Sequence, residues 1–286
     1  MLLHEPGRYP VAYFPRADIQ PDVLIAEDRV TNHGPCKSAA TADAMGTPSS
    51  VLVFDVNETL IDIDFLAPLF EQIFGDPRVV HEWFGQLVLY SMTTTMSGCY
   101  VDFFTLGQGL LKMLADIHHV DITGEDLRRV KEGMLTMPAH PDVADGLTAL
   151  RDYGFRLVTL TNSPPNPDGP SPLEHAGLGH LFERQFSVDK HRAFKPAPLV
   201  YRSVCEELKV APAECMMVAA HVWDTIGAQG TGFSAALITR PGNAPLPIHG
   251  LPQPNIVAAD LRDLARQLGE RSSSPDERHL GGDAIQ

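Results

Sequence analysis

Several features that assign a protein to a specialised class are missing from this sequence. Its 286 residues include only four cysteines, which are widely and irregularly spaced and form no C-x-x-C pair. This pattern matches neither a disulfide framework nor a zinc site, so we expect reduced thiols. No stretch approaches the roughly 18 to 20 consecutive apolar residues of a membrane span, and the first ten residues lack the basic start and apolar run of a secretory signal. We therefore expect a soluble cytoplasmic protein.

Positive charge is scarce as well. The formal net charge is −14, from 22 basic and 36 acidic residues. An acidic surface disfavours nucleic acids and anionic membranes, so we expect neither as a partner. An anionic substrate would need a local positive site that works against this overall field.

The stretch Val51–Phe54 (VLVF) is the element around which the chain is organised. Its four residues do not alternate with polar ones, which predicts a strand buried on both faces of a parallel sheet. Asp55 then lies at the carboxyl end of this strand, where open α/β sheets bind ligands. This stretch alone leaves two interpretations open: a catalytic carboxylate with the Thr59 hydroxyl near it, or an aspartate that caps the following segment.

A long helical region follows this strand. Apolar residues recur at helix spacing in four runs, at 65–75, 79–90, 103–117 and 123–135. Thr123 is the expected N-cap of the last run, whose first turn is acidic. Because a βα unit needs far less chain than this, we predict a helical cap at residues 65–137, inserted over the strand ends.

The rest of the chain alternates between strands and helices, as is typical of a parallel α/β sheet. Strands are predicted at 156–161, 185–188, 215–219 and 233–239, with a last short strand and helix within 256–268. Helices are predicted at 141–153, 173–178, 195–208 and 223–230. The predicted α/β core therefore consists of residues 50–64 and 138–268.

The two ends of the chain differ from this core in composition. Residues 1–49 are rich in Pro, Gly, Ala, Ser and Thr, which predicts an N-terminal extension that is partly a linker. His33, Cys36 and Lys37 lie close together in it, and we interpret them as part of a flexible polar stretch. Residues 269–286 are predicted to form a disordered tail.

Polar side chains stand at the carboxyl ends of the predicted strands. These residues are Asp55 after the first strand, Thr161 and Asn162 after the second, Lys195 beyond the third, and His221 and Asp224 after the fourth. Because such ends share one edge of a parallel sheet, we predict that they converge on a single site beneath the cap. A lysine beside Asp55 would keep the carboxylate ionised and nucleophilic, so the expected intermediate is an aspartyl ester or an acyl phosphate.

Four motifs in the chain resemble those of a known family. FDVNETL, LTNS, SVDKHRAFKPAPLVY and VAAHVWDTIGAQGTGF stand in the order and spacing of the haloacid dehalogenase superfamily. They are most similar to its type II (S)-2-haloacid dehalogenases, and the resemblance covers about residues 50–268. It implies a Rossmann-like parallel-sheet core with an inserted helical cap, a small-molecule substrate and a possible homodimer.

The resemblance also implies roles for individual residues. Asp55 would be the nucleophile, supported by Thr59 and balanced in charge by Lys195. The remaining roles fall to Thr161 and Asn162, which would hold the substrate carboxylate or the halide, to Tyr201 beyond the lysine, and to Asp224, which would help to position water.

The main choice within the superfamily is between phosphate and halide chemistry. Its phosphatases carry a second aspartate in a D-x-D-x-T motif, whereas this chain has Asn57, which cannot transfer a proton at neutral pH. Halide leaves without a proton, so we predict displacement of halide from a short 2-haloalkanoic acid with no metal or cofactor. The alternatives are a magnesium-dependent small-molecule phosphatase that uses Asp55 and Asp224, and a catalytically silent binding protein.

The chain departs from the type II pattern in two places. The stretch EWFGQL has Trp83 and Phe84 but lacks the arginine that the cap of these enzymes presents, and Arg78 nearby is expected on a solvated helix start. Ala219 and His221 replace a serine and an asparagine of the last motif. His221 is left with three interpretations: a hydrogen-bonding substitute, a base that activates water, or a structural histidine.

Other residues of the cap region have simpler explanations. We expect His118 and His119 to lie at a helix end rather than to bind a metal. Phe65, Trp83 and Tyr90 are candidates for the lining of an apolar pocket, although most cap aromatics should be core residues.

Overall fold

Strand β1 (Val51–Phe54) lies inside a six-stranded sheet in a computed structural model that describes residues 49–273. The strand order is β3-β2-β1-β4-β5-β6, and every neighbouring pair is parallel. The other strands are β2 (Arg156–Thr161), β3 (Arg184–Ser187), β4 (Cys215–Ala219), β5 (Ser234–Ile238) and β6 (Ile256–Ala258). All four side chains of β1 are buried, which confirms the strand predicted from its unbroken apolar run.

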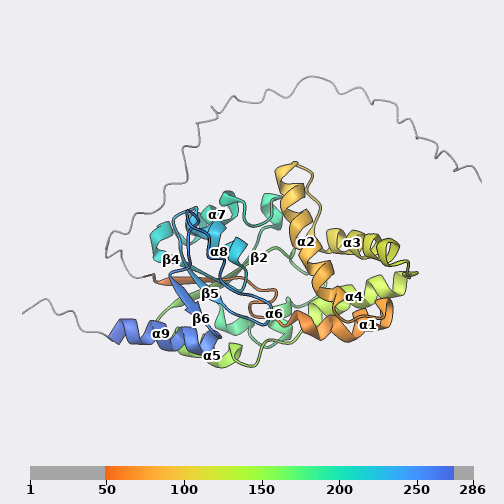
Figure 1. Ribbon diagram of the computed structural model, residues 1–286. Helices are drawn as coiled ribbons and strands as arrows, with labels where there is room; N and C mark the ends of the chain where they lie inside the picture. The colour runs from red at the N-terminus through yellow and green to blue at the C-terminus, as the bar shows by residue number, and fades with distance from the viewer. Residues whose placement is uncertain (1–48, 274–286) are drawn as a thin grey trace, which may run out of the picture. The chain divides into compact units, whose positions relative to one another are not determined.

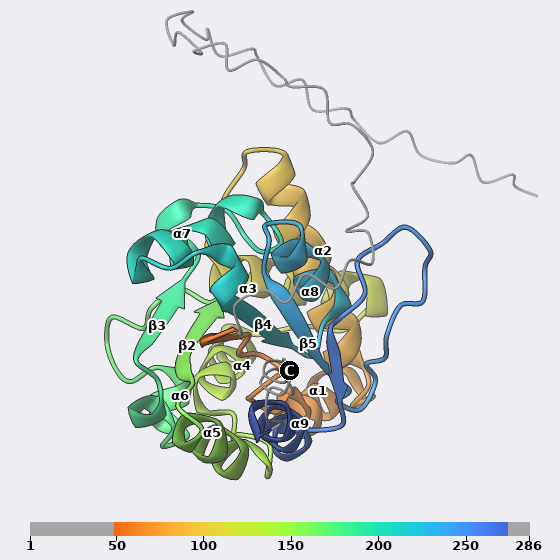
Figure 2. The ribbon, with the colours of Figure 1, turned by 90° about the vertical axis from the view of Figure 1, so that its left-hand side faces the viewer.

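Helices cover both faces of this sheet (Figure 2). One face is covered by α7 (Pro198–Leu208) and α8 (Val222–Gln229), and the other by α5 (Val143–Asp152), α6 (Pro172–His175) and α9 (Leu261–Ser273). Helices α5 and α9 cross closely at Gly146, where a Cβ atom would lie 2.5 Å from the Leu261 Cβ. These layers form the predicted Rossmann-like α/β core.

The inserted cap consists of four helices that lie beside the carboxyl edge of the sheet (Figure 1). A short 3₁₀ turn, Ile63–Leu66, leads into α1 (Ala67–Phe74), α2 (Val79–Met96), α3 (Phe103–His118) and α4 (Gly124–Thr136). The fully buried Trp83 ties α2 to α3, because its Nε1 donates to the Gly107 carbonyl at 2.9 Å. Thr123 caps α4 in a reciprocal pair of hydrogen bonds with Asp126, as predicted from the sequence.

The two connections between cap and core run side by side. The Asp62 N–H donates to the Pro138 carbonyl at 2.9 Å, and the His140 N–H donates to the Leu60 carbonyl at 3.0 Å. This antiparallel pairing holds the entry and the exit of the cap together, a few residues beyond Asp55.

Some predicted boundaries are wrong. Helix α7 begins at Pro198 and not at Lys195. The helical conformation is unfavourable for a residue that precedes a proline, and both Lys195 and Ala197 precede one. The helix predicted at 173–178 is shorter, because α6 ends at His175, and a separate 3₁₀ turn follows at Gly179–Leu181. Helix α9 continues to Ser273, beyond the predicted end of the core at residue 268. The predictions for residues 1–48 and 274–286 lie outside the described residues.

None of the helices within residues 49–273 has the length and apolar character needed to cross a membrane.

Candidate active site

Asp55 directly follows β1 and is almost completely buried. Its Oδ2 accepts a hydrogen bond from the Thr59 hydroxyl at 2.7 Å, and its Oδ1 accepts one from the Lys195 ammonium at 2.7 Å. Burial alone would raise the pKa of Asp55, but Lys195 and His221 hold that pKa well below its usual range. The side chain is therefore a fixed, ionised carboxylate, as a nucleophile requires.

The ammonium of Lys195 lies between two carboxylates. Its side chain has no exposed surface, and Nζ donates to Asp224 Oδ2 at 2.6 Å as well as to Asp55. Burial would lower the pKa of Lys195, but the charges of Asp224 and Asp55 raise it above its usual value. The lysine thus remains charged, as a role in charge balance would require.

Asp224, near the start of α8, anchors this lysine. Its Oδ1 accepts from the Tyr201 hydroxyl at 2.6 Å, while its Oδ2 accepts from Lys195. Burial raises the pKa of Tyr201 well above its usual value, so this hydroxyl keeps its proton and donates it. The Asp224 side chain has no exposed surface, so in this arrangement it positions Lys195 and Tyr201 rather than facing an open cavity.

Thr161 and Asn162, at the end of β2, serve two different partners. The Asn162 side-chain oxygen accepts the Lys195 backbone N–H at 3.0 Å and so fixes the segment that carries the lysine. The Thr161 hydroxyl accepts the Ser163 N–H at 3.1 Å, and its side chain faces a cavity beside the site. The structure therefore brings both residues to the predicted edge of the sheet.

His221 links Asp55 to a residue that sequence reasoning missed, Glu58. The His221 Nδ1 lies 3.3 Å from Asp55 Oδ2, and its Nε2 lies 2.5 Å from Glu58 Oε2. Burial alone would lower the pKa of His221, but the hydrogen bonds to Asp55 and Glu58 raise it to about 9. The imidazole ring is therefore cationic at neutral pH. The signal for Glu58 was its place in the first motif, three residues after Asp55.

A cavity of about 530 Å³ opens against Glu58 and His221. Phe84 of α2 and Trp223 of α8 lie 6.0 and 5.1 Å, respectively, from the His221 ring, measured between centroids. The outer wall includes His81, whose Nε2 lies 2.9 Å from Asp64. Among the described residues that line this cavity there is no lysine or arginine.

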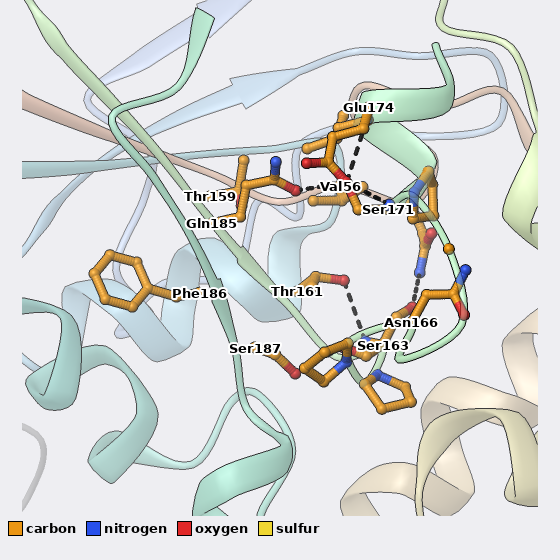
Figure 3. Close-up of a pocket in the computed structure, with 16 residues that line it drawn as sticks. Val56, Thr159, Thr161, Ser163, Asn166, Ser171, Glu174, Gln185, Phe186 and Ser187 are labelled. Atoms are coloured by element: carbon orange, nitrogen blue, oxygen red, sulfur yellow. Dashed lines mark hydrogen bonds between the residues drawn. The ribbon is translucent and has the colours of Figure 1, made fainter. Parts of the chain in front are cut away.

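A second cavity, of about 280 Å³, lies at the ends of β2 and β3 under the loop before α6 (Figure 3). Asn57, Thr161 and Ser163 line it on the side of the active site. The Thr159 hydroxyl also lines it and is buried without a hydrogen-bond partner. Asp55 is followed in the chain by Val56 and Asn57, which face this cavity, and by Glu58, which faces the larger one.

The carboxylates of Asp55 and Asp224 are not arranged to hold a magnesium ion. Both carboxylates point at the Lys195 ammonium, and both oxygens of Asp224 already accept hydrogen bonds. Within residues 49–273, no three histidine, cysteine or acidic side chains gather in a way that would bind a metal ion. The two nitrogens of His221 also point at different carboxylates, Asp55 and Glu58.

The cap places its aromatic residues differently from what we predicted. Phe65 and Tyr90 are exposed and Trp83 is fully buried within the cap, whereas Phe84, the residue after Trp83, approaches the His221 ring. Arg78 is exposed and pairs with Asp76, as expected for a solvated helix start. His118 and His119 lie at the end of α3, also as expected.

Comparison with known proteins places this geometry in a family. The family described as haloacid dehalogenase-like hydrolase matches residues 50–232. (S)-2-haloacid dehalogenase 1 of Pseudomonas sp. (strain CBS-3) is 29% identical over 196 residues, which cover 68% of this chain and 86% of that protein. Phosphoglycolate phosphatase of Aliivibrio fischeri is 28% identical over 229 residues, which cover 76% and 96% of the two chains.

A solved structure shares the fold across nearly its whole length. The L-2-haloacid dehalogenase of Xanthobacter autotrophicus with chloropropionic acid covalently bound superposes with a TM-score of 0.70 at 25% identity, covering 79% of this chain and 99% of that one. Since the family match spans more than half of the sequence and the cap and core agree with that structure, this chain belongs to the haloacid dehalogenase-like hydrolases.

Proposed function

We propose that this protein removes halide from a short 2-haloalkanoic acid by hydrolysis, with Asp55 as the nucleophile and without a metal ion. One observation carries the proposal: the buried Asp55 carboxylate is held ionised by Lys195 and Thr59, while Asn57 stands where a phosphatase of the superfamily would carry a second acid. An amide at position 57 cannot donate a proton to a leaving group as that second acid would, which suits a leaving group that needs no proton.

The first step is a displacement at carbon. Oδ2 of Asp55 lies on the side of His221 and the larger cavity, and it attacks the carbon that carries the halogen. The new carbon–oxygen bond forms as the carbon–halogen bond breaks, halide leaves with the electron pair, and the configuration at carbon inverts. The rings of Phe84 and Trp223 offer an apolar surface to the departing halide.

The substrate carboxylate is bonded to the carbon that Asp55 attacks, so it must lie within reach of Asp55 Oδ2, and we assign it to the polar groups at the end of β2. Thr161 and Asn162, which the family resemblance gives this role, lie at the end of β2, and Thr161 lines the smaller cavity. Its hydroxyl accepts one hydrogen bond from the Ser163 N–H and still has its own proton to donate to an anion.

The second step is hydrolysis of the aspartyl ester. Water adds to Cγ of Asp55, and negative charge develops on Oδ1, where the Lys195 ammonium donates a hydrogen bond at 2.7 Å. Cleavage of the bond between Cγ and Oδ2 releases the 2-hydroxy acid and restores the carboxylate. The overall reaction consumes one water and yields one halide ion and one proton.

The relatives support this reaction more than the alternative. The protein from Pseudomonas is described as an (S)-2-haloacid dehalogenase, and the structure from Xanthobacter holds covalently bound chloropropionic acid. The similarity to phosphoglycolate phosphatase favours the second candidate, a magnesium-dependent phosphatase. The carboxylates of Asp55 and Asp224 fit this second candidate poorly, since the Lys195 ammonium lies between them where a magnesium ion would have to bind.

The deciding experiment measures both activities on one preparation. Halide release from 2-chloropropionate and chloroacetate is followed in excess EDTA, beside hydrolysis of p-nitrophenyl phosphate with added magnesium. We expect halide release that EDTA does not reduce. Phosphate release alone would establish the phosphatase, and a folded protein inactive in both assays would favour a catalytically silent binding protein.

The homodimer implied by the family resemblance and the expected cytoplasmic location stay predictions. Light scattering coupled to size exclusion would test the first of them.

A further inference from the structure

The side chains of Glu58, His221 and Asp55 form a line of hydrogen-bonding groups that ends on the nucleophile. Glu58 contacts one ring nitrogen of His221, and the other nitrogen lies 3.3 Å from Asp55 Oδ2. The side chain of His221 is 8% exposed and that of Glu58 is 17% exposed, so the line is nearly buried yet reaches the wall of the larger cavity. A carboxylate and a histidine at this spacing are the parts of a general base.

We propose that His221, positioned by Glu58, is the catalytic base and acid of the ester-hydrolysis step. This inference rests on the proposed function and adds to it a proton path that Asp224 does not offer in this structure. Asp224 is sealed behind Lys195 and Tyr201, whereas His221 touches the oxygen that becomes the ester oxygen and faces a cavity that admits water.

The charges around His221 explain how one residue can serve both steps. Asp55 and Glu58 contact the ring directly, the uncharged Trp223 and Phe84 cover its faces, and Lys195 approaches from beyond Asp55. His81 and Asp64 stand further out on the cavity wall. In the free enzyme two carboxylates hold His221 as an imidazolium, which cannot act as a base.

Formation of the ester changes this balance. Alkylation removes the negative charge of Asp55, so one of the two anions that stabilise the imidazolium is lost. The proton on Nδ1 then faces a neutral ester oxygen and is released to solvent through the larger cavity. His221 becomes neutral at the stage where a base is needed, and Glu58 still holds Nε2.

The proton can then be followed through each bond change. Neutral His221 takes a proton from water as the water oxygen bonds to Cγ of Asp55. The tetrahedral intermediate breaks the bond between Cγ and Oδ2, and the imidazolium gives its proton to Oδ2, which leaves as the product hydroxyl. Asp55 is left as a carboxylic acid that transfers its proton to His221, which restores the starting pair. One proton has gone to solvent and balances the halide ion.

The backbone at Glu58 shows that this residue is held in place. Its φ is +62°, in the left-handed region that few residues other than glycine adopt. Its N–H donates to the Ile61 carbonyl at 2.9 Å, and its carbonyl lies 3.0 Å from the His140 Nε2. Glycine would adopt this backbone conformation with less strain than glutamate. The glutamate at this position therefore indicates that its side chain has a function.

The test separates the two chemical steps in His221→Gln. Rapid mixing with 2-chloropropionate should give a burst of about one halide per active site, followed by turnover roughly 10²-fold slower, since general acid–base groups contribute at least this factor. Intact-mass spectrometry should show the ester accumulating on the variant. His118→Gln is the matched control, because His118 also pairs with a glutamate, Glu82 at 2.9 Å, but lines neither cavity; it should release halide at the wild-type rate without an adduct.

Rescue by imidazole distinguishes a chemical role from a structural one. In His221→Ala, added imidazole should shorten the lifetime of the ester, with a dependence on pH that follows neutral imidazole, and it should not accelerate the wild type. Glu58→Gln should slow ester hydrolysis more than ester formation and should alter the pH profile of kcat.

Three outcomes decide the matter. Turnover of His221→Gln at the wild-type rate, or loss of its halide burst together with the adduct, would overturn the role of His221. Absence of imidazole rescue in a folded His221→Ala protein would do the same. Failure of the proposed function looks different, because the wild type itself would then release no halide from any haloacid.

Discussion

Two groups of buried charged side chains meet at Thr59, and they differ in how their charges are balanced. The structural pair consists of Arg240 and Asp142, with Arg240 Nη1 and Nη2 at 2.6 and 3.0 Å from the two carboxylate oxygens. Arg240 also donates to the Thr59 carbonyl at 3.1 and 2.9 Å. The active-site group begins at the other end of the same residue, where the Thr59 hydroxyl donates to Asp55.

In the structural pair, one cation meets one anion in a two-pronged contact, and the Leu261 N–H adds a further donor to Asp142 at 2.8 Å. In the active-site group, two cations face three carboxylates, those of Asp55, Glu58 and Asp224. A balanced pair without an opening can only hold elements together, whereas an excess of carboxylate at a cavity leaves reactive charge available to a substrate.

The largest expected effect comes from the same substitution made in each group. Asp55→Asn should reduce halide release by more than about 10³-fold, because an amide is not a nucleophile, and should also lower stability, since Lys195 and His221 each keep only one of their two carboxylates. Asp142→Asn should keep halide release within about twofold but lower the free energy of unfolding by about 3 kcal/mol, since it leaves Arg240 buried without its anion.

This contrast is measured on the wild type, the two single variants and the double variant. Each is assayed for steady-state halide release and for unfolding in urea. Undiminished halide release by Asp55→Asn would remove Asp55 as the nucleophile.

The second prediction uses opposite dependences of stability on pH. The pKa of His221 in the folded protein is about 9, above its ordinary 6.5, so its contribution to stability is complete below pH 6.5 and is lost as pH rises through 9. The size of this loss is on the order of 3 kcal/mol. His221→Gln should flatten this alkaline decline.

Asp142 should behave in the opposite way. Burial raises its pKa, but Arg240 and the Leu261 N–H lower it below the ordinary 3.8, so its contribution is present above that pH and is lost as pH falls further. Asp142→Asn should remove part of the acid decline and leave the alkaline side unchanged. Urea unfolding from pH 3 to pH 10 would measure both slopes, and an alkaline decline that His221→Gln does not alter would contradict the assignment.

The smallest expected effect comes from making the active-site group more like the balanced pair. Phe84→Arg would place a guanidinium on the wall of the larger cavity, which has no lysine or arginine among its described residues. We expect the KM for 2-chloropropionate to fall by about tenfold, or 1.4 kcal/mol, relative to that for neutral 2-chloropropionamide.

Phe84→Gln is the uncharged control for this change and should not discriminate between the two substrates. An equal change in KM for the acid and the amide would show that charge in this cavity does not govern substrate choice.

Much of the fold followed from local patterns. The unbroken apolar run of β1, the helical spacing of the cap and the polar residue after each strand predicted the parallel core, the insertion and the edge where Asp55 and Lys195 meet. Such patterns are readable because burial on both faces, one-sided burial and chain reversal each leave a signature over a few neighbouring residues. The misplaced start of α7 had a local cause too, in the proline after Lys195.

What the sequence determined by itself was therefore the set of elements, their order along the chain and the residues that end each strand. Only the tertiary structure decided the strand order and the partners: Glu58 with His221, 163 residues apart, and Arg240 with Asp142, 98 residues apart. The physical reason is that a buried hydrogen bond or ion pair depends on where two distant segments come together, and neither segment carries a local pattern that reports its partner.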